Sequence, residues 1–295
     1  MLPKIYKLMF WFSISLAIAS VVLVAVYGLR LGVDFRGGSV FELEFTARPE
    51  IDQIRQTLQP ITGDVELSPA GDSGVIIRAH ELTEAQHQQT LVALRSAFPN
   101  AGLQENKFDS VGPVISNELK QKSIVAIFLV LAAVIIYIAF VFRKIGRTTS
   151  SWAMGLAAIV ALLHDVIIPL GVFAVLGHYY GIEVTGVFVA AALTILGFSV
   201  SDTVVIFDRV RENIIRSGLR DKGEFGSVVH RSVMQTLARS LNNTFAVLLS
   251  LFAIYFFGGE SIKYFSLALI IGIFLGAYSS IFVASPLLVW WTKKT

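Results

Sequence analysis

Six long apolar runs dominate the pattern of hydrophobic and polar positions along this chain of 295 residues. An α-helix needs about 20 residues to cross the roughly 30 Å hydrocarbon core of a bilayer, and each run has about that length or more. We therefore predict six membrane-spanning helices. The first is too long for a typical signal-peptide core and is expected to remain as an anchor. The six runs are Met9–Leu29, Ser123–Phe142, Ser151–Gly177, Val184–Phe207, Arg239–Phe257 and Tyr264–Trp291.

The segment between the first two runs, residues 30–122, has a different pattern of short alternating stretches. Its order βαββαβ predicts a ferredoxin-like α+β domain, with two helices on one face of a four-stranded antiparallel sheet. Thr83 with Glu84 is a predicted helix N-cap with an acidic first turn, and Pro99–Gly102 is predicted to stop that helix. The predicted strands are Ser39–Phe45, Val65–Ser68, Gly74–Ala79 and Leu103–Asp109, and the predicted helices are Pro49–Leu58 and Thr83–Ala97.

The predicted organisation is thus an α-helical polytopic membrane protein with one soluble insertion. Residues 1–29 form the N-terminus and first span, residues 30–122 the ferredoxin-like domain, and residues 123–295 the bundle of the other five spans. The composition agrees, because 55% of the residues are hydrophobic and only 15% are charged, which is too apolar for one soluble domain.

The sequence lacks two features, cysteine and a phosphate-binding loop, and this limits the reactions that the chain could catalyse. The chain contains no cysteine, which excludes disulfides, thiol catalysis and cysteine-ligated metals. It also lacks the Gly-x-x-x-x-Gly-Lys-Ser/Thr loop of ATP-hydrolysing proteins. We expect no enzyme activity and no cofactor or metal, and any energy source must lie outside the chain.

Basic residues set the predicted orientation, since Lys and Arg accumulate in short cytoplasmic loops. The connections that follow the third and fifth runs are poor in Lys and Arg, whereas both termini and the other two short connections are basic. We therefore predict that both termini are cytoplasmic and that residues 30–122 lie outside. The basic positions are Lys4, Lys7, Arg143, Lys144, Arg147, Arg209, Arg211, Arg216, Arg220, Lys222, Arg231, Lys293 and Lys294.

Asp202 is an acid near the cytoplasmic end of the fourth run. A carboxylate in hydrocarbon costs about 3 kcal/mol on insertion scales, so it is kept where it is paired, solvated or used. Arg239 opens the fifth run, and because the two helices are antiparallel, it is predicted to lie at the depth of Asp202 and to pair with it. Ser199 shares a helix face with Asp202, and Asn243 is four residues beyond Arg239. We predict that these residues act on a coupling ion; the alternative is an acid that snorkels to the interface.

His164 and Asp165 are adjacent near the middle of the third run. Histidine titrates near neutral pH, so His164 is a candidate proton relay, with Asp165 as a second candidate ion-coupling carboxylate. The alternative is a packing pair in which the two side chains satisfy each other. The sequence leaves both interpretations open.

The two joints between the spans and the domain are the next candidates. Asp34 and the pair Gly37 and Gly38 follow the first span, and Gly112 and Pro113 precede the second. Glycine permits backbone angles closed to other residues, which suits a tight turn at each joint. These residues form either plain connectors or a transmission joint between an ion site and a moving domain.

Two other patterns are interpreted as structural. The charges within Asp208–Glu212 are typical of a solvated helix end beside the membrane surface. Gly272 and Gly276 have the GxxxG spacing that allows close helix approach. That approach serves either a contact within the chain or an interface with a partner.

Several segments resemble signatures of the SecF proteins, which are related to the resistance-nodulation-division (RND) transporters. With six spans and a single large inserted domain, the resemblance covers nearly the whole chain. The segments are Leu31–Gly38 (LGVDFRGG), Val111–Leu119 (VGPVISNEL), Ala161–Ile168 (ALLHDVII) and Gly197–Asn213.

The resemblance implies half of an RND-like machine in the bacterial cytoplasmic membrane. Such proteins pair with SecD and are thought to use the proton or sodium gradient to help move an unfolded preprotein through the SecYEG channel. YajC and YidC are further implied partners, and no nucleic acid is expected. The resemblance also implies functional roles for Asp202 and Arg239. The run Ser240–Phe245 departs from the usual small-residue-rich sequence, and the connection around Gly218–Gly226 looks longer than usual.

Two other function classes remain open at this stage. A small-molecule exporter of the same superfamily usually carries two such halves and two large domains in one chain, whereas this sequence has one of each. A passive scaffold of the translocation channel would use no ions. It predicts that Asp202 and Arg239 can be made neutral without loss.

Overall fold

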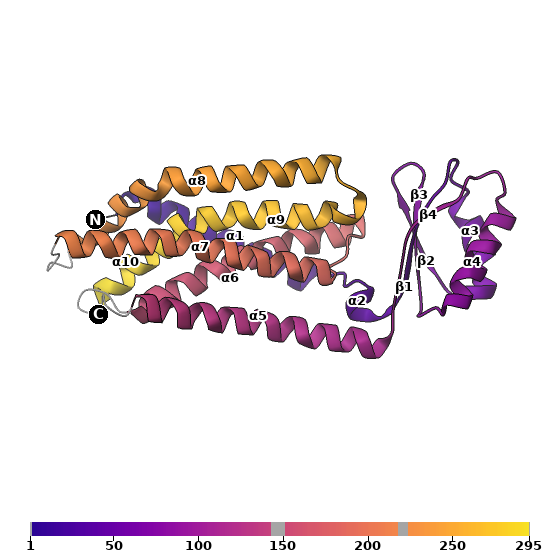
Figure 1. Ribbon diagram of the computed structural model, residues 1–295, viewed down its shortest axis with the longest axis horizontal. Coiled ribbons are helices and arrows are strands. Elements are labelled where there is room, and N and C mark those ends of the chain that lie inside the picture. The colour runs from indigo at the N-terminus through magenta and orange to yellow at the C-terminus, as the bar shows by residue number, and fades with distance from the viewer. Residues whose placement is uncertain (1, 143–150, 218–223, 295) are drawn as a thin grey trace. The chain divides into compact units, whose positions relative to one another are not determined.

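The computed structural model describes residues 2–142, 151–217 and 224–294 (Figure 1). The basic residues Arg143, Lys144, Arg147, Arg220 and Lys222, and most of the connection Gly218–Gly226, lie outside the described residues. The chain forms two compact units. We name them the helical unit (Met1–Leu29, Val125–Ile182 and Val187–Thr295) and the sheet unit (Arg30–Ile124 and Glu183–Gly186).

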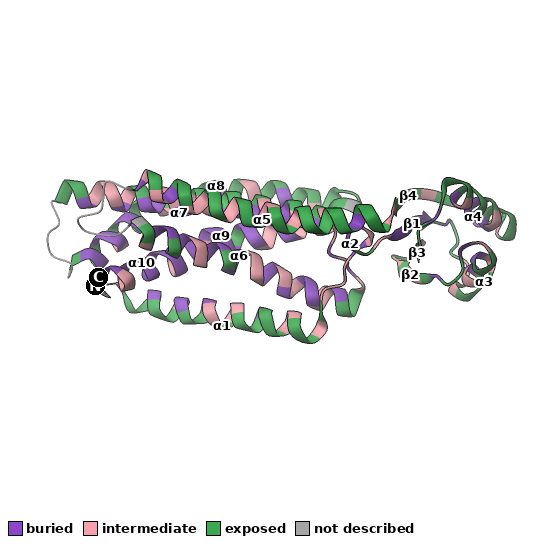
Figure 2. Cartoon of the chain, turned by 90° about the horizontal axis from the view of Figure 1, so that it is seen from below, coloured by how far each residue is buried: buried purple, intermediate pink, exposed green. Residues whose placement is uncertain are grey.

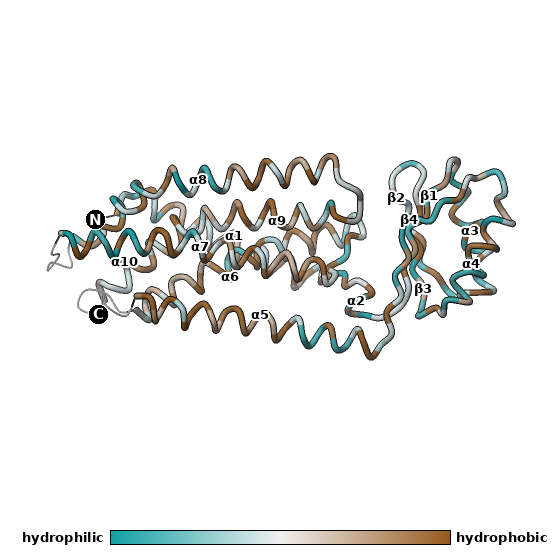
Figure 3. The backbone as a smooth tube through the Cα atoms, in the orientation of Figure 1, coloured by the Kyte–Doolittle hydropathy of each residue, from teal (hydrophilic) through white to brown (hydrophobic). Residues whose placement is uncertain are grey.

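Six spans are found within the described residues, as the apolar runs predict. Apolar residues make up most of their length (Figure 3). Each span extends beyond its predicted run at one end or both, because polar residues there continue the helical hydrogen bonding, whereas α1, α5 and α7 stop one or two residues short at the other end. The spans are α1 (Lys4–Tyr27), α5 (Pro113–Val141), α6 (Ser151–Tyr180), α7 (Gly186–Ser217), α8 (Phe225–Phe257), and α9 (Glu260–Ser279) continued by α10 (Ser285–Lys294).

The last span contains a π-helical turn, Ser280–Ala284, between α9 and α10. Ser285 Oγ donates to the carbonyl of Ser280, five residues back, at 2.9 Å. A π-turn holds one more residue than an α-turn and often marks a functional site. This span and α6 are the most buried spans, whereas α5 is the least buried (Figure 2).

The sheet unit has the predicted ferredoxin-like fold, with antiparallel strands in the order β2-β3-β1-β4 and helices α3 and α4 on one face (Figure 1). Phe41, Leu43 and Ile77 alternate along the strands and point into the core beneath the helices. A four-residue helix, α2, was not predicted. The elements are α2 (Val33–Arg36), β1 (Gly38–Glu44), α3 (Ile51–Thr62), β2 (Glu66–Ala70), β3 (Gly74–Ala79), α4 (Glu84–Ala97) and β4 (Gln104–Val111).

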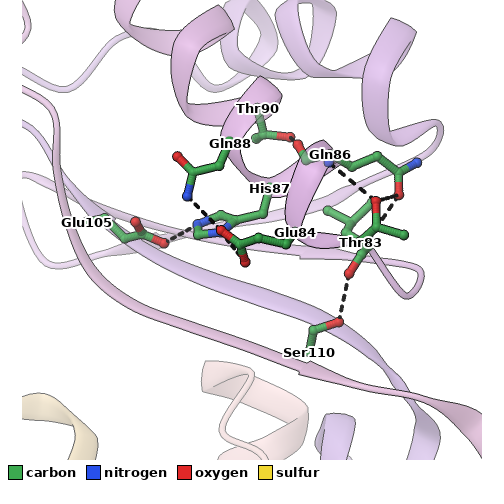
Figure 4. Close-up of polar contacts among 9 residues, drawn as sticks. Thr83, Glu84, Gln86, His87, Gln88, Thr90, Glu105 and Ser110 are labelled. Atoms are coloured by element: carbon green, nitrogen blue, oxygen red, sulfur yellow. Dashed lines mark hydrogen bonds and ion pairs between the residues drawn. The ribbon is translucent and has the colours of Figure 1, made fainter.

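Helix α4 begins with the predicted cap. The hydroxyl of Thr83 accepts from the backbone N–H of Gln86, whose side chain accepts from the Thr83 N–H in return. The buried ring of His87 then joins the helix to the sheet, since Nδ1 lies 3.2 Å from Glu84 and Nε2 lies 2.7 Å from Glu105 of β4 (Figure 4). The first turn of α4 is therefore fixed to β4.

We expect Glu84→Gln to destabilise the protein at neutral pH but not in acid. Hydrogen bonds from Gln88 and His87 hold the pKa of Glu84 below its ordinary value of 4.5. A carboxylate whose pKa is lowered by folding adds stability above its unfolded pKa, and that stability is lost as the pH falls through the folded pKa. Thermal midpoints of wild type and variant in detergent should differ at neutral pH and converge well below pH 4.5. A pH-independent difference would contradict this assignment.

The glycine pair before β1 has the predicted unusual backbone angles, with φ +77° at Gly37 and +113° at Gly38. A Cβ added at Gly38 would lie 2.7 Å from the backbone carbonyl oxygen of Ala79. The exit joint differs from the prediction, because Gly112 is not among the glycines with positive φ. Pro113 is the first residue of α5, where its missing N–H costs no helical hydrogen bond. The exit therefore uses a helix-starting proline and no glycine turn.

We expect Gly38→Ala to destabilise the protein more than Gly63→Ala. Gly63 also has a positive φ, +70°, but no heavy atom lies within 4 Å of its would-be Cβ. Its substitution therefore costs only the backbone strain of about 1–3 kcal/mol, whereas Gly38→Ala adds a clash with backbone. Thermal midpoints of the two variants in detergent measure the difference. Equal midpoints would show that the close approach to Ala79 is relieved without cost.

Candidate ion-coupling site in the helical unit

Asp165 on α6 is a carboxylate with no exposed surface, held by side chains from three helices. Its Oδ1 lies 2.9 Å from Nδ1 of His164. Its Oδ2 accepts from Ser199 Oγ on α7 at 2.5 Å and from Ser279 Oγ on α9 at 2.7 Å. Because an unpaired buried charge is costly, these donors are what allow a carboxylate at this place. The three spans α6, α7 and α9 therefore share one acid.

A chain of polar side chains continues from His164 toward α1. The His164 ring lies against the ring of Tyr278 on α9, with centroids 6.4 Å apart. The Tyr278 hydroxyl accepts from Ser13 at 3.1 Å and donates to the carbonyl of Met9 at 3.0 Å. Nε2 of His164 is buried without a hydrogen-bond partner among the described residues. The predicted pair of His164 and Asp165 is thus formed through Nδ1 of His164, whereas the hydrogen-bonding capacity of Nε2 is not satisfied by it.

The GxxxG pair packs α9 against α7 within the chain. A Cβ added at Gly276 would lie 3.1 Å from the Cβ of Ser199, and one at Gly272 would lie 2.2 Å from the side chain of Ile195. The same helix interface continues at Thr203 and Ser280, whose hydroxyls are 2.9 Å apart. Of the two alternatives, the structure therefore supports the internal contact. This close approach brings Ser199 to the carboxylate of Asp165.

Asp202 is half-buried on α7, one turn beyond Ser199. Its neighbour across the helix interface is Ser240 of α8, whose buried hydroxyl forms no well-shaped hydrogen bond, and its own helix reaches Asp165 through Ser199. The ion pairs of the described residues do not include one between Asp202 and Arg239. Consecutive residues of a helix point about 100° apart, so α8 presents Ser240 to Asp202 and turns Arg239 aside. Among the described residues the predicted ion pair with Arg239 is therefore not formed, and Ser240, the residue next to Arg239, takes its place beside Asp202.

Arg239 instead lines a hollow of about 280 Å³ between α5, α7 and α8. Asn243, one turn further along α8, is exposed. The hollow contains carboxylates from α7 as well as apolar groups from α5. Its lining residues are Tyr137, Val141, Val204, Val205, Asp208, Arg209, Glu212, Thr236 and Arg239.

The charges at the end of α7 pair mainly with one another. Arg209 lies 2.6 Å and Arg216 lies 2.7 Å from Glu212, and Arg211 lies 3.4 Å from Asp208. Such pairs at helical spacing are typical of a solvated helix surface. This agrees with the structural interpretation of the cluster.

Asp34, one of the joint residues, lies in the sheet unit and caps a span. Its Oδ2 accepts from the backbone N–H of Gly186, the first residue of α7, at 2.7 Å. The N-terminus of a helix leaves N–H groups unpaired and carries partial positive charge, so a carboxylate stabilises it. The joint after the first span is thereby connected to the start of α7.

Two residues of the site, Ser240 and Ser279, were not among the predicted site residues. The signal for Ser279 is present in the sequence, because serines are rare in the middle of apolar runs, yet the last run contains Ser279, Ser280 and Ser285. Ser240 has no comparable signal in the sequence, because it directly follows Arg239, the charged residue of the same span.

Comparison with known families decides the affiliation of the chain. Residues 92–294 match the family model described as "Protein export membrane protein SecD/SecF, C-terminal", and residues 22–47 match "SecD/SecF GG Motif". The chain belongs to the SecD/SecF family. The segment that carries the family's GG motif includes Asp34, Gly37 and Gly38.

Individual relatives place the chain among the SecF members of the SecD/SecF family. The Thermobaculum terrenum "Protein translocase subunit SecF" is 41% identical over 96% of this chain and 90% of its own length. The Brucella abortus "Protein translocase subunit SecDF" is 36% identical over 92% of this chain and 35% of its own. The crystal structure of SecDF from Thermus thermophilus matches with a TM-score of 0.80 and 29% identity, covering 98% of this chain and 38% of that chain.

Proposed function

We propose that this chain is the SecF half of a SecD–SecF pair and couples a proton or sodium gradient to late steps of preprotein movement through SecYEG. The observation that carries the proposal is the buried carboxylate of Asp165, shared by α6, α7 and α9, with a second acid, Asp202, one turn along α7 from its partner Ser199. Ionisable groups inside a membrane protein mark ion pathways by default, because they are costly to keep otherwise.

SecD is the proposed partner that completes the ion path. The Brucella and Thermus proteins are named SecDF, and this chain matches 35% and 38% of their lengths. Arg239 and Asn243 are exposed on α8 of the isolated chain, and polar groups in a span are costly unless covered. A second six-span half would cover them. YajC and YidC are further proposed partners that no contact within this chain bears on.

The proposed cellular location is the bacterial cytoplasmic membrane, with both termini on the cytoplasmic side and residues 30–122 on the outer side. The support is the distribution of Lys and Arg, which favours basic connections on the cytoplasmic side. In this orientation α7 runs inward, so Asp202 lies one turn nearer the cytoplasm than Ser199, which contacts Asp165. An ion that enters from outside would therefore pass Asp165 before Asp202.

The proposed mechanism uses the two neighbouring carboxylates as one switch. Binding of a cation at Asp202 removes its repulsion of Asp165, and release restores that repulsion. The change shifts α7 against α9, and the shift reaches the sheet unit through the segments around Asp34 and Gly112. One elementary charge crossing 100 mV releases about 2.3 kcal/mol, which biases a two-state equilibrium by about fifty-fold.

Reconstituted export tests the proposal. Proteoliposomes with SecD, SecYEG, the ATP-driven motor of the channel and a preprotein are prepared with and without this chain. Export is then followed under an imposed pH gradient, an imposed sodium gradient, and after an ionophore collapses each. We expect an increment of export that needs both the chain and one of the gradients. The effective gradient identifies the ion.

The alternatives make different predictions in the same assay. A passive scaffold raises export equally with and without a gradient. The export increment due to the chain would then not depend on the gradient. A small-molecule exporter leaves preprotein export unchanged and instead raises the accumulation of apolar dyes in the vesicles, because it moves them in the direction in which the preprotein is exported. Either pattern would overturn the proposed function.

A further inference from the structure

The short connection between α6 and α7 is built into the sheet unit. Val184 and Leu31 form a parallel β-bridge, with the Gly32 N–H donating to the Val184 carbonyl at 2.9 Å and the Val184 N–H donating to the Arg30 carbonyl at 2.7 Å. Gly32 is needed for this fit, because a Cβ there would lie 2.8 Å from the Thr185 side chain. The connection therefore behaves as a structured element of the sheet unit.

A half-buried ion pair fastens this connection to the sheet itself. Nε of Arg78, on β3, lies 2.5 Å from Oε1 of Glu183 as an ion pair without hydrogen-bond geometry, and each side chain is 15% exposed. Arg30 lies 3.9 Å from the same carboxylate and also pairs with Glu66 of β2. An arginine–carboxylate pair shielded from water is stronger and better fixed than an exposed one. Strand β3 is therefore joined to the residue three positions before α7.

Glu183 and Asp34 act at the same helix end. Asp34 accepts the N–H of Gly186 at 2.7 Å, so α7 begins between a backbone bridge, a capping carboxylate and the ion pair. Ser199 and Asp202 lie 13 and 16 residues further along α7, about 20 and 24 Å at 1.5 Å per residue. A continuous helix thus runs from the sheet unit to the ion-coupling residues.

We propose that Glu183 and Arg78 form a rigid tie that positions the start of α7 against the sheet and transmits movement of the Asp202-bearing helix to it. The inference rests on the proposed function and deepens it. The joints at α1 and α5 each lead from one span into the sheet unit. The tie fixes the segment Glu183–Gly186, which leads from α6 into the span that carries the acid, to the sheet. Glu183 and Arg78 are positioning residues: they hold α7 and touch no ion.

The first test removes the tie in the full chain, reconstituted with SecD and SecYEG. Glu183→Ala and Arg78→Ala should each lose most of the gradient-dependent export increment, while export without a gradient and copurification with SecD stay normal. The size of gradient that gives half the maximal increment should be unchanged, because the ion site is intact, and only the maximum should fall. A merely structural role would lower SecD copurification and basal export together.

Matched controls come from the same unit. Arg48 donates to the carbonyls of Gly71 and Gly74, and the Asp52 side chain is 86% exposed beside Arg55. Arg48→Ala and Asp52→Ala remove the same charges outside the tie. Both should keep the full increment.

The second test restores the tie by another bond. The chain contains no cysteine, so Leu31→Cys with Val184→Cys offers only one disulfide at the bridge. With a cysteine-free preprotein, oxidation should restore the increment of the Glu183→Ala chain, and a reductant should remove it again. In an otherwise wild-type chain the same disulfide should leave the increment unchanged, because a rigid tie stays closed throughout the cycle.

The outcomes separate the inference from the function on which it rests. A full increment in Glu183→Ala, with the increment of Asp202→Asn lost, would overturn the tie and leave the proposed function standing. A disulfide that blocks export in the wild-type chain would overturn the rigid tie, because the bridge would then have to open. A wild-type chain without any gradient-dependent increment would overturn the proposed function and the tie with it.

Discussion

Replacing Asp202 by Asn should abolish the gradient-dependent part of preprotein export, while we expect the chain to remain folded and bound to SecD. Asparagine keeps the size of the side chain and its place beside Ser240, but it carries no charge to be neutralised by a cation. The variant should therefore export as wild type does after an ionophore has collapsed the gradient. Asp202→Glu, which retains the carboxylate, should keep part of the increment.

The matched control for this variant is Asp208→Asn on the same helix. Asp208 lies about one and a half turns further along α7, and its side chain is 62% exposed beside Arg211. It carries the same charge outside the buried site, so its variant should export normally. Undiminished gradient-dependent export in Asp202→Asn would rule out this acid as the coupling residue.

Replacing Asp165 by Ala has the second large effect, on stability as well as on export. The substitution leaves Ser199, Ser279 and His164 without their shared acceptor in a site closed to water. Removing one partner of a buried charged network costs about 3–5 kcal/mol. The thermal midpoint in detergent should fall clearly, and the export increment should be lost.

A double substitution checks that the cost comes from this network. In His164→Leu with Asp165→Leu, the charge and its adjacent partner are removed together, so the combined loss should be smaller than the sum of the two single losses. His230→Leu is a control, because His230 contacts Tyr6 at 3.0 Å and touches none of these groups. Strictly additive losses, or an unchanged midpoint in Asp165→Ala, would contradict a shared buried carboxylate.

The sequence predicted the elements of the fold because each leaves a local signal. A run of about 20 apolar residues predicts a membrane-spanning helix, and alternation of apolar and polar residues with a period of two predicts the strands of the sheet. Thr83 could be recognised as a cap from its position before a helical pattern. Helix α2 left no such signal, because four residues between two glycines contain less than two turns.

The contacts of the site could be predicted only in part, since sequence gives the depth of a residue in a span but not the rotation of its helix. The antiparallel course of the two helices predicts matching depth for Asp202 and the start of the fifth run, yet Ser240 of α8 lies beside the acid in place of Arg239. Ser199 was assigned to Asp202 on its own helix, whereas close packing at Gly276 directs it across to Asp165. These choices depend on how α7, α8 and α9 face one another.

The role of the α6–α7 connection was also invisible in sequence. A short stretch between two spans has no periodicity, and Glu183 is one acid in a loop. Its role depends on its ion pair with Arg78, more than 100 residues earlier in the chain, and on the neighbouring β-bridge between Val184 and Leu31. Contacts between distant segments of the chain are what the fold adds to the pattern.

The π-helical turn Ser280–Ala284 takes up one residue more than an α-helical turn would. Deleting one residue there would close the turn to an ordinary α-helix, so the residues of α10 would keep the faces that they now present. Deleting Pro286, within α10 itself, has no wide turn to absorb it and would rotate the rest of that helix by about 100° around its axis. Leu288, which has no exposed surface, would then leave the core. The last span should therefore tolerate the loss of one residue in its wide turn better than the loss of one residue just after it.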